Sequence, residues 1–126
     1  ALIRGEDDMA TVSLRIDLGE DRRFGPGKAR LLELIRDTGS ISAAARALGM
    51  SYRRAWLLAD ELNKLFGHRL VEPQHGGVKG GGARITEDGD AMLEAYLRIE
   101  AAAEKALERE MKLFASRANT NKGERR

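Results

Sequence analysis

Three consecutive side chains with hydrogen-bonding groups, Tyr52, Arg53 and Arg54, follow Ser51 at the predicted start of a helix. An arginine guanidinium can bind a guanine or a phosphate through two parallel hydrogen bonds, and a tyrosine hydroxyl can donate to a phosphate oxygen. A serine in the position before them can cap the helix or contact a phosphate itself. On the first turn of an exposed helix, such a set is typical of a surface that enters the major groove of DNA.

The element that must position these side chains is predicted over residues 40–58, as two short helices joined by a turn. Ala44 or Ala45 supplies the small side chain that a close helix crossing needs, and Gly49 tolerates a positive φ in the turn. Ser42, on the first of these helices, is a second candidate for phosphate contact or capping. The pattern predicts a helix-turn-helix, although an alanine-rich hairpin in an all-helical protein would fit this segment alone.

The second helix is predicted to run from Ser51 to about Phe66 and to stop at Gly67. Trp56 is expected in the core as a large anchor. Leucines and a phenylalanine are expected to form the rest of the buried side, namely Leu57, Leu58, Leu62, Leu65 and Phe66.

Two strand candidates, residues 69–73 and 83–86, flank a glycine-rich loop and predict a hairpin. A hairpin directly after a helix-turn-helix is typical of the wing of a winged helix. Lys79 and Arg84, with His75 as a polar helper, would bring charge to the DNA backbone or minor groove. A nucleotide-binding loop is disfavoured because a strand follows it and no Gly-Lys-Ser/Thr pattern is present, whereas a flexible turn without function remains an alternative.

Before this region, residues 12–18 alternate apolar and polar side chains, which predicts a half-buried strand that pairs with the wing hairpin. A break at residues 25–27 then precedes a helix that ends at Gly39. Residues 1–9 are expected to be a disordered leader or a cloning remnant, and residues 10–86 a single winged domain.

A long helix is predicted over residues 87–115, with Thr86 as its N-cap, followed by a basic, disordered tail at 116–126. An apolar stripe with near-heptad spacing follows this helix, interrupted by Glu110. A small domain could cover the first two turns of the stripe but hardly the last four, so the stripe predicts a twofold dimer. The predicted dimerisation residues are Met92, Tyr96, Ile99, Ala103, Ala106 and Leu113.

Composition limits the other classes of function. The 126 residues include no cysteine and only two histidines, His68 and His75, so no nucleophile and base pair, metal cluster or paired buried carboxylates can be assembled. We therefore expect no enzymatic activity and no cofactor. No apolar run approaches the roughly 20 residues that cross a bilayer, which favours a cytoplasmic protein without membrane contact.

Charge is unevenly distributed along the chain. Residues 40–84 carry a net charge of +4 and residues 85–114 a net charge of −4, within a total of +2. Such a split suits one face that meets phosphate and another that meets solvent or a partner, although chance variation would also produce it.

These motifs together resemble a known family. The run from Ser40 to Ala45 and the later segment 85–89 are similar to the DNA-binding domain of LysR-type regulators, and residues 51–56 and the wing 76–82 are similar to ModE, the molybdate-responsive regulator. The resemblance implies a mainly α (α+β) winged helix-turn-helix with an N-terminal strand, a two-stranded wing and a long dimerisation helix. It further implies a homodimer on a palindromic promoter site in double-stranded DNA.

ModE also has C-terminal domains that bind molybdate, and nothing in this chain resembles them, so no small-molecule effector is expected here. The sequence thus predicts a dimeric transcriptional regulator. The alternatives are a winged-helix scaffold for protein interaction and a nonspecific architectural DNA-binding protein, since a fold alone does not fix function.

Overall fold

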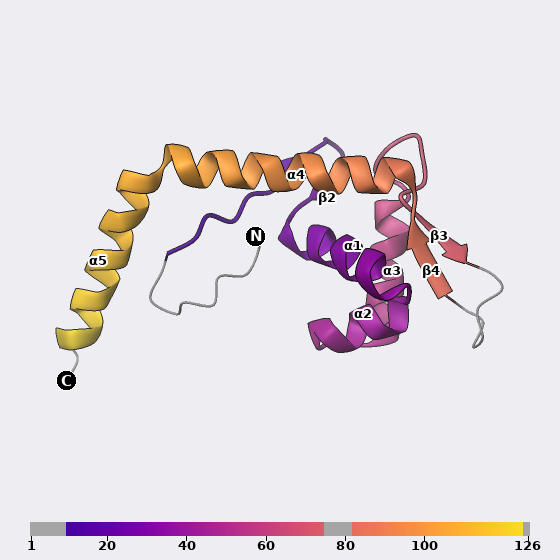
Figure 1. Cartoon of the computed structure of the whole chain (residues 1–126), viewed down its shortest axis with the longest axis horizontal. Helices are drawn as coiled ribbons and strands as arrows, with labels where there is room; N and C mark the ends of the chain where they lie inside the picture. Colours follow the sequence, from indigo (N-terminus) through magenta and orange to yellow (C-terminus); the bar gives the residue numbers. More distant parts are fainter. Residues whose placement is uncertain (1–9, 75–81, 125–126) are drawn as a thin grey trace.

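The computed structural model describes residues 10–74 and 82–124 and shows a small helical domain with a hairpin at its side (Figure 1). Three helices pack together, a long helix lies across them, and a last helix projects away at an angle. The elements in chain order are β1 (Ile16–Asp17), β2 (Arg23–Phe24), α1 (Pro26–Thr38), α2 (Ile41–Leu48), α3 (Tyr52–Leu62), β3 (Val71–Gln74), β4 (Gly82–Ile85), α4 (Glu87–Ala106) and α5 (Glu108–Glu124). The mainly α winged helix-turn-helix predicted from the sequence is confirmed.

The N-terminal strand does not pair with the wing, contrary to the prediction. β1 pairs with β2 in an antiparallel register that places Ile16 opposite Phe24. A tight turn between them has Gly19 at φ 89° and a hydrogen bond of 2.7 Å from the Leu18 amide to the Arg22 carbonyl. A local turn closes at a small entropic cost, whereas pairing with the distant wing would close a far longer loop.

Helix α1 begins inside the segment that was predicted to be a break. Pro26 occupies its first position, where the missing N–H of proline is no loss and its fixed φ suits the helix. The predicted end is confirmed, because Gly39 adopts φ 73° and its amide donates to the Ile35 carbonyl.

Helix α4 begins at the predicted cap and lies against the wing. The Thr86 hydroxyl accepts a hydrogen bond of 3.0 Å from the Gly89 amide and donates one of 2.8 Å to the Arg69 carbonyl. A Cβ on Gly89 would lie 2.5 Å from the Leu70 carbonyl oxygen, so only glycine allows this approach. The start of the long helix is therefore fixed to the segment that leads into β3.

The long helix is not continuous, contrary to the prediction. α4 ends at Ala106, Leu107 leaves helical geometry at φ −105° and ψ 20°, and α5 then runs to Glu124 through most of the segment predicted as a disordered tail. The bend occurs at neither a proline nor a glycine. Charge and polarity predicted a solvated segment, but glutamate, lysine, arginine and alanine also favour a helix that is exposed on all sides.

Tyr96 belongs to the core of its own chain and not to an exposed stripe. Its ring lies 5.2 Å from that of Phe24, and its hydroxyl donates a hydrogen bond of 2.5 Å to the Leu14 carbonyl. Burial raises the pKa of Tyr96 to about 12. Met92 also packs, partly buried, against this core. Two of the six predicted dimerisation residues are thus used within the chain, because α4 packs on α1 and on the core around Phe24.

One carboxyl group on α4 is buried. Glu100 is only 5% exposed, and its Oε1 accepts no hydrogen bond from the described residues. Burial raises the pKa of the Glu100 carboxyl above its ordinary value, and the nearby carboxylates of Glu104 and Glu33 act in the same direction. Folding therefore disfavours ionisation of Glu100 relative to the unfolded chain.

Replacing Glu100 with glutamine is expected to stabilise the protein at neutral pH by about 1 kcal/mol, or about 4 °C in Tm. Because folding raises the pKa of Glu100, this carboxyl contributes stability at low pH that is lost as the pH rises through its pKa in the folded state. Glutamine does not ionise, so the variant does not lose stability in this way. Thermal unfolding followed between pH 4 and pH 8 measures the effect. Glu108→Gln, at an exposed position of α5, is the matched control, and equal pH profiles for wild type and Glu100→Gln would contradict the prediction.

Candidate DNA-binding surface

The turn between α2 and α3 has the geometry that the sequence predicted. Gly49 adopts φ 70°, and the Met50 amide donates a hydrogen bond of 3.0 Å to the Ala45 carbonyl, which closes the end of α2. Ala44, Ala45 and Ala55 are buried where the two helices meet. Because these side chains are so small, α2 and α3 can cross closely and hold α3 at a fixed angle on the domain.

Serine side chains cap both helices. The Ser51 hydroxyl accepts a hydrogen bond of 3.1 Å from the Arg54 amide and so fixes the first turn of α3. The cap of α2 is Ser40, whose hydroxyl accepts from the Ala43 amide, and not Ser42. Ser42 is exposed one turn before Arg46, from which it accepts a hydrogen bond of 3.2 Å.

The first turn of α3 presents the three candidate side chains to solvent. Tyr52, Arg53 and Arg54 are all exposed and make no side-chain hydrogen bond or ion pair with another described residue. The N-terminus of α3 adds unpaired backbone N–H groups and the positive end of the helix dipole. This end of α3 can therefore accept phosphates or base edges without first breaking contacts within the chain.

Two side chains of α3 that were predicted to be buried are exposed. Trp56 is 48% exposed and Leu57 is 43% exposed. The core side of α3 is formed instead by Ala55, Ala59 and Leu62, which are buried. Ala55 and Ala59 are small enough for the close crossing with α2, whereas Trp56, about 100° around the helix from Ala55, lies outside this buried side.

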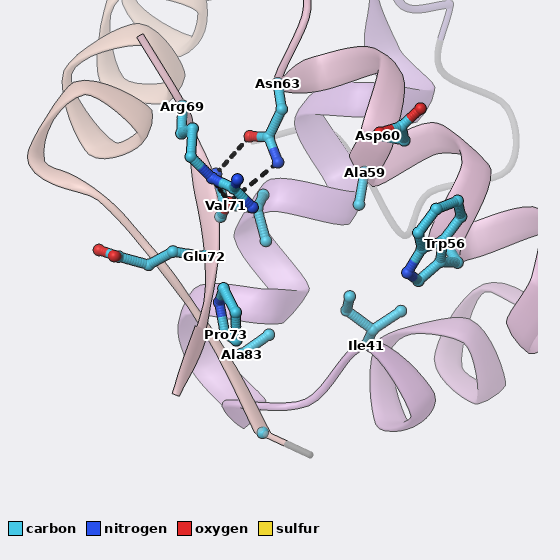
Figure 2. A pocket seen from close by; sticks show the side chains of 11 residues that line it. Ile41, Trp56, Ala59, Asp60, Asn63, Arg69, Val71, Glu72, Pro73 and Ala83 are labelled. Carbon is cyan, nitrogen blue, oxygen red and sulfur yellow. Dashed lines mark hydrogen bonds between the residues drawn. The ribbon is translucent and has the colours of Figure 1, made fainter. Parts of the chain in front are cut away.

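Helix α3 ends at Leu62, four residues before the predicted end, because the side chain of Asn63 takes over the hydrogen bonding. Its Oδ1 accepts from the Val71 amide at 2.9 Å and its Nδ2 donates to the Val71 carbonyl at 3.0 Å (Figure 2). Its Oδ1 also accepts from the Leu70 amide at 2.8 Å. Asn63 thereby ties the end of α3 to the start of β3. Neither periodicity nor composition signals this role.

The wing strands pair as predicted, within slightly shifted bounds. β3 and β4 are antiparallel, with Glu72 directly opposite Arg84. These two side chains form an ion pair of 3.0 Å, so the Arg84 charge already has an acidic neighbour. The other two wing candidates, His75 and Lys79, lie outside the described residues.

A shallow groove of about 220 Å³ separates α3 from the wing hairpin. Figure 2 shows Trp56 and Ile41 at one end of it and the strand that carries Glu72 and Pro73 at the other. The indole N–H of Trp56 makes no hydrogen bond with the described residues. The groove lies next to the exposed turns of α3.

Within residues 10–74 and 82–124, no group of three histidine, cysteine, aspartate or glutamate side chains could hold a metal ion. None of the helices described there is long and apolar enough to cross a membrane. His68 is exposed, as predicted, with its Nδ1 3.7 Å from an Asp88 carboxylate oxygen.

The model of the bacterial regulatory helix-turn-helix proteins of the lysR family matches residues 27–90, from the start of α1 to the first turn of α4. The chain belongs to this family. The matched segment contains all of the helix-turn-helix and the wing, and it confirms the resemblance drawn from the motifs.

Known relatives agree with the family match. The chain is 46% identical over 85 residues to the molybdenum-pterin-binding protein MopA of Rhodobacter capsulatus, which covers 68% of this chain and 32% of that protein. It is 34% identical over 99 residues to the transcriptional regulator ModE of Yersinia pestis, which covers 79% of this chain and 38% of ModE. It is 38% identical over 87 residues to the DNA-binding transcriptional dual regulator ModE of Escherichia coli K12, and this match covers 69% of this chain and 33% of that protein. The chain thus spans about a third of the length of these relatives.

These likenesses support a DNA-binding transcriptional regulator. The sequence had missed three exposed side chains on or beside the candidate surface, namely Arg46, Trp56 and Leu57. Arg46 could have been found by its spacing of four from Ser42, since residues four apart share a helix face.

Proposed function

We propose that this protein is a sequence-specific, dimeric transcriptional regulator that inserts α3 into the major groove of DNA. The observation that carries the proposal is the first turn of α3, where Tyr52, Arg53 and Arg54 are exposed and have no side-chain partner among the described residues, on a helix whose start is fixed by Ser51. In this role Arg53 contacts a base edge, while Arg54 and Tyr52 contact base edges or phosphates. Ser42 and Ser51 are the proposed serine contacts with phosphate.

The wing is proposed to follow the backbone or the minor groove beside α3. Asn63 supports this arrangement because it joins the end of α3 to β3 through three hydrogen bonds. Lys79 and His75 are the proposed contacts of its loop, and Arg84 is the least favoured of the wing candidates because Glu72 already neutralises it.

Dimerisation is proposed through the exposed apolar side chains of α4 and α5. Ile99, Leu107, Leu113 and Phe114 are exposed, and Ala103 and Ala106 lie between the first two along the chain. α5 projects away from the three-helix body in Figure 1, so the described residues offer this surface no cover. A second copy related by a twofold axis would cover it and would place two recognition helices on half-sites about 10 base pairs, or a multiple of that, apart.

Selection of bound sequences from a random duplex pool tests the proposal. We expect enrichment of a palindromic site whose half-sites have this spacing. Enrichment of no sequence, with salt-sensitive binding to all duplexes, would indicate an architectural DNA-binding protein. No salt-sensitive binding to any duplex would indicate a protein-interaction scaffold.

We place no effector site on the described residues. The relatives whose names refer to molybdenum share only the segment described here, about a third of their length. The proposal is therefore limited to DNA binding and dimerisation.

A further inference from the structure

The exposed large apolar side chains of the described residues fall into two groups. One group follows α4 and α5, where the second copy is proposed to bind. The other group is on α3 and consists of Tyr52, Trp56 and Leu57. Dimerisation through α4 and α5 does not account for this second group.

The burial pattern of α3 shows which way these side chains face. Ala55, Ala59 and Leu62 mark the side that packs on the domain. At 100° per residue, Arg53 and Leu57 fall on the opposite side of the helix. Arg53 and Leu57 are four apart, so they are neighbours on one exposed face, with Cβ atoms about 5–6 Å from each other.

Trp56 occupies the flank of this face that borders the groove. It lines the groove together with Ile41 and Ala59, as Figure 2 shows for all three. One side of the indole is therefore supported by the domain, while the rest is open. Leu57 does not line the groove and projects on the outer face of α3.

The exposed Leu57 side chain has neither charge nor a hydrogen-bond donor, so it adds nothing to phosphate binding. The apolar group that the major groove does offer is the 5-methyl group of thymine. Contact between that methyl group and Leu57 would remove apolar surface of both partners from water. Trp56 would exclude water from the flank of the same contact.

We infer that Leu57 is a specificity-determining residue that recognises the 5-methyl group of a thymine in each half-site. Trp56 closes this contact on the side that faces the protein groove between α3 and the wing hairpin. The inference rests on the proposed insertion of α3 into the major groove. Because the Cβ atoms of Arg53 and Leu57 are about 5–6 Å apart and base pairs are 3.4 Å apart along the duplex, the thymine lies one or two base pairs from the base read by Arg53.

The test uses the full chain and the duplex obtained by selection, in which each thymine in turn is replaced by deoxyuridine to remove only the methyl group. Wild type is expected to lose about 3-fold to 10-fold in affinity at one thymine of each half-site. Leu57→Ala is expected to bind the unmodified duplex more weakly and to be insensitive to deoxyuridine at that position. Leu57→Met, which keeps an apolar side chain of similar reach, is expected to retain most of the sensitivity.

Arg98→Ala is the control, because Arg98 is exposed on α4 and belongs neither to α3 nor to the proposed dimer contacts. It is expected to leave the ratio of thymine to deoxyuridine affinities unchanged at every position. Circular dichroism of each variant confirms that its helices are intact.

Two results would overturn the inference while leaving the proposed function in place. In one, Leu57→Ala keeps the same deoxyuridine sensitivity as wild type at every thymine. In the other, Leu57→Ala lowers the affinity for selected and random duplexes equally, which would indicate nonspecific packing on DNA or binding of a protein partner. Absence of any sequence preference in wild type would overturn the proposed function as well, so the two failures are distinguishable.

Discussion

Replacing Ile99 with glutamate is expected to convert the protein to a monomer and to lower its affinity for a palindromic duplex by about 100-fold or more. Ile99 is on the solvent side of α4 and is 45% exposed. In a twofold dimer the substitution would place two carboxylates in an apolar interface, where desolvation of each charge is unfavourable. A monomer binds one half-site at a time and loses the gain from binding both at once.

The oligomeric state is measured by light scattering coupled to size exclusion, and the affinity by titration of the selected duplex and of a single half-site. The mass is expected to fall to that of one 13.9 kDa chain, while single half-site affinity stays within about 3-fold, because α3 is not altered. Ala101→Glu introduces the same charge at an exposed position on almost the opposite side of α4 and is the control. A dimeric Ile99→Glu protein with wild-type affinity would contradict the proposed interface.

Replacing Arg53 with alanine is expected to reduce affinity for the selected duplex by about 10-fold to 100-fold and to relax the preference at one base pair of each half-site. Arg53 is exposed on the outer face of α3 and has no partner among the described residues. Its guanidinium is therefore available for two hydrogen bonds to a guanine, which alanine cannot make.

The measurement compares affinities for the selected duplex, for its single-base variants and for random duplex at one salt concentration. Random duplex should lose far less affinity than the selected one. Arg98→Ala removes an exposed arginine from α4 and should change neither affinity by more than about 2-fold. If Arg53→Ala lost the same affinity for selected and random duplex, Arg53 would contact a phosphate and not a base.

Much of the helix-turn-helix could be read from residues 40–58 because its determinants are local. A positive φ at Gly49, a serine cap at Ser51 and small residues at the helix crossing depend on neighbours within a few positions. Thr86 and Gly39 were identified as helix boundaries for the same reason. The wing also followed from strand and loop patterns, and the family match confirmed the segment as a whole.

Side chains whose burial depends on other elements were placed wrongly. Trp56 was expected in the core because tryptophan is large and apolar, but the buried side of α3 is formed by Ala55, Ala59 and Leu62, and Trp56 lies outside it. Tyr96 was expected in the dimer stripe because of its spacing, yet Phe24 and the Leu14 carbonyl, more than 70 residues earlier, hold it in the core. Spacing identifies the face of a helix but not what covers it.

The sequence by itself determined the class of protein, the helix-turn-helix with its wing and the first turn of α3 as the candidate contact with DNA, since caps, turns and periodicity are properties of short segments. Only the tertiary structure decided which apolar side chains remain outside the core, where the long helix bends and how Asn63 joins α3 to the wing. These features depend on the distance between elements far apart in the chain, and packing fixes that distance where no local pattern can.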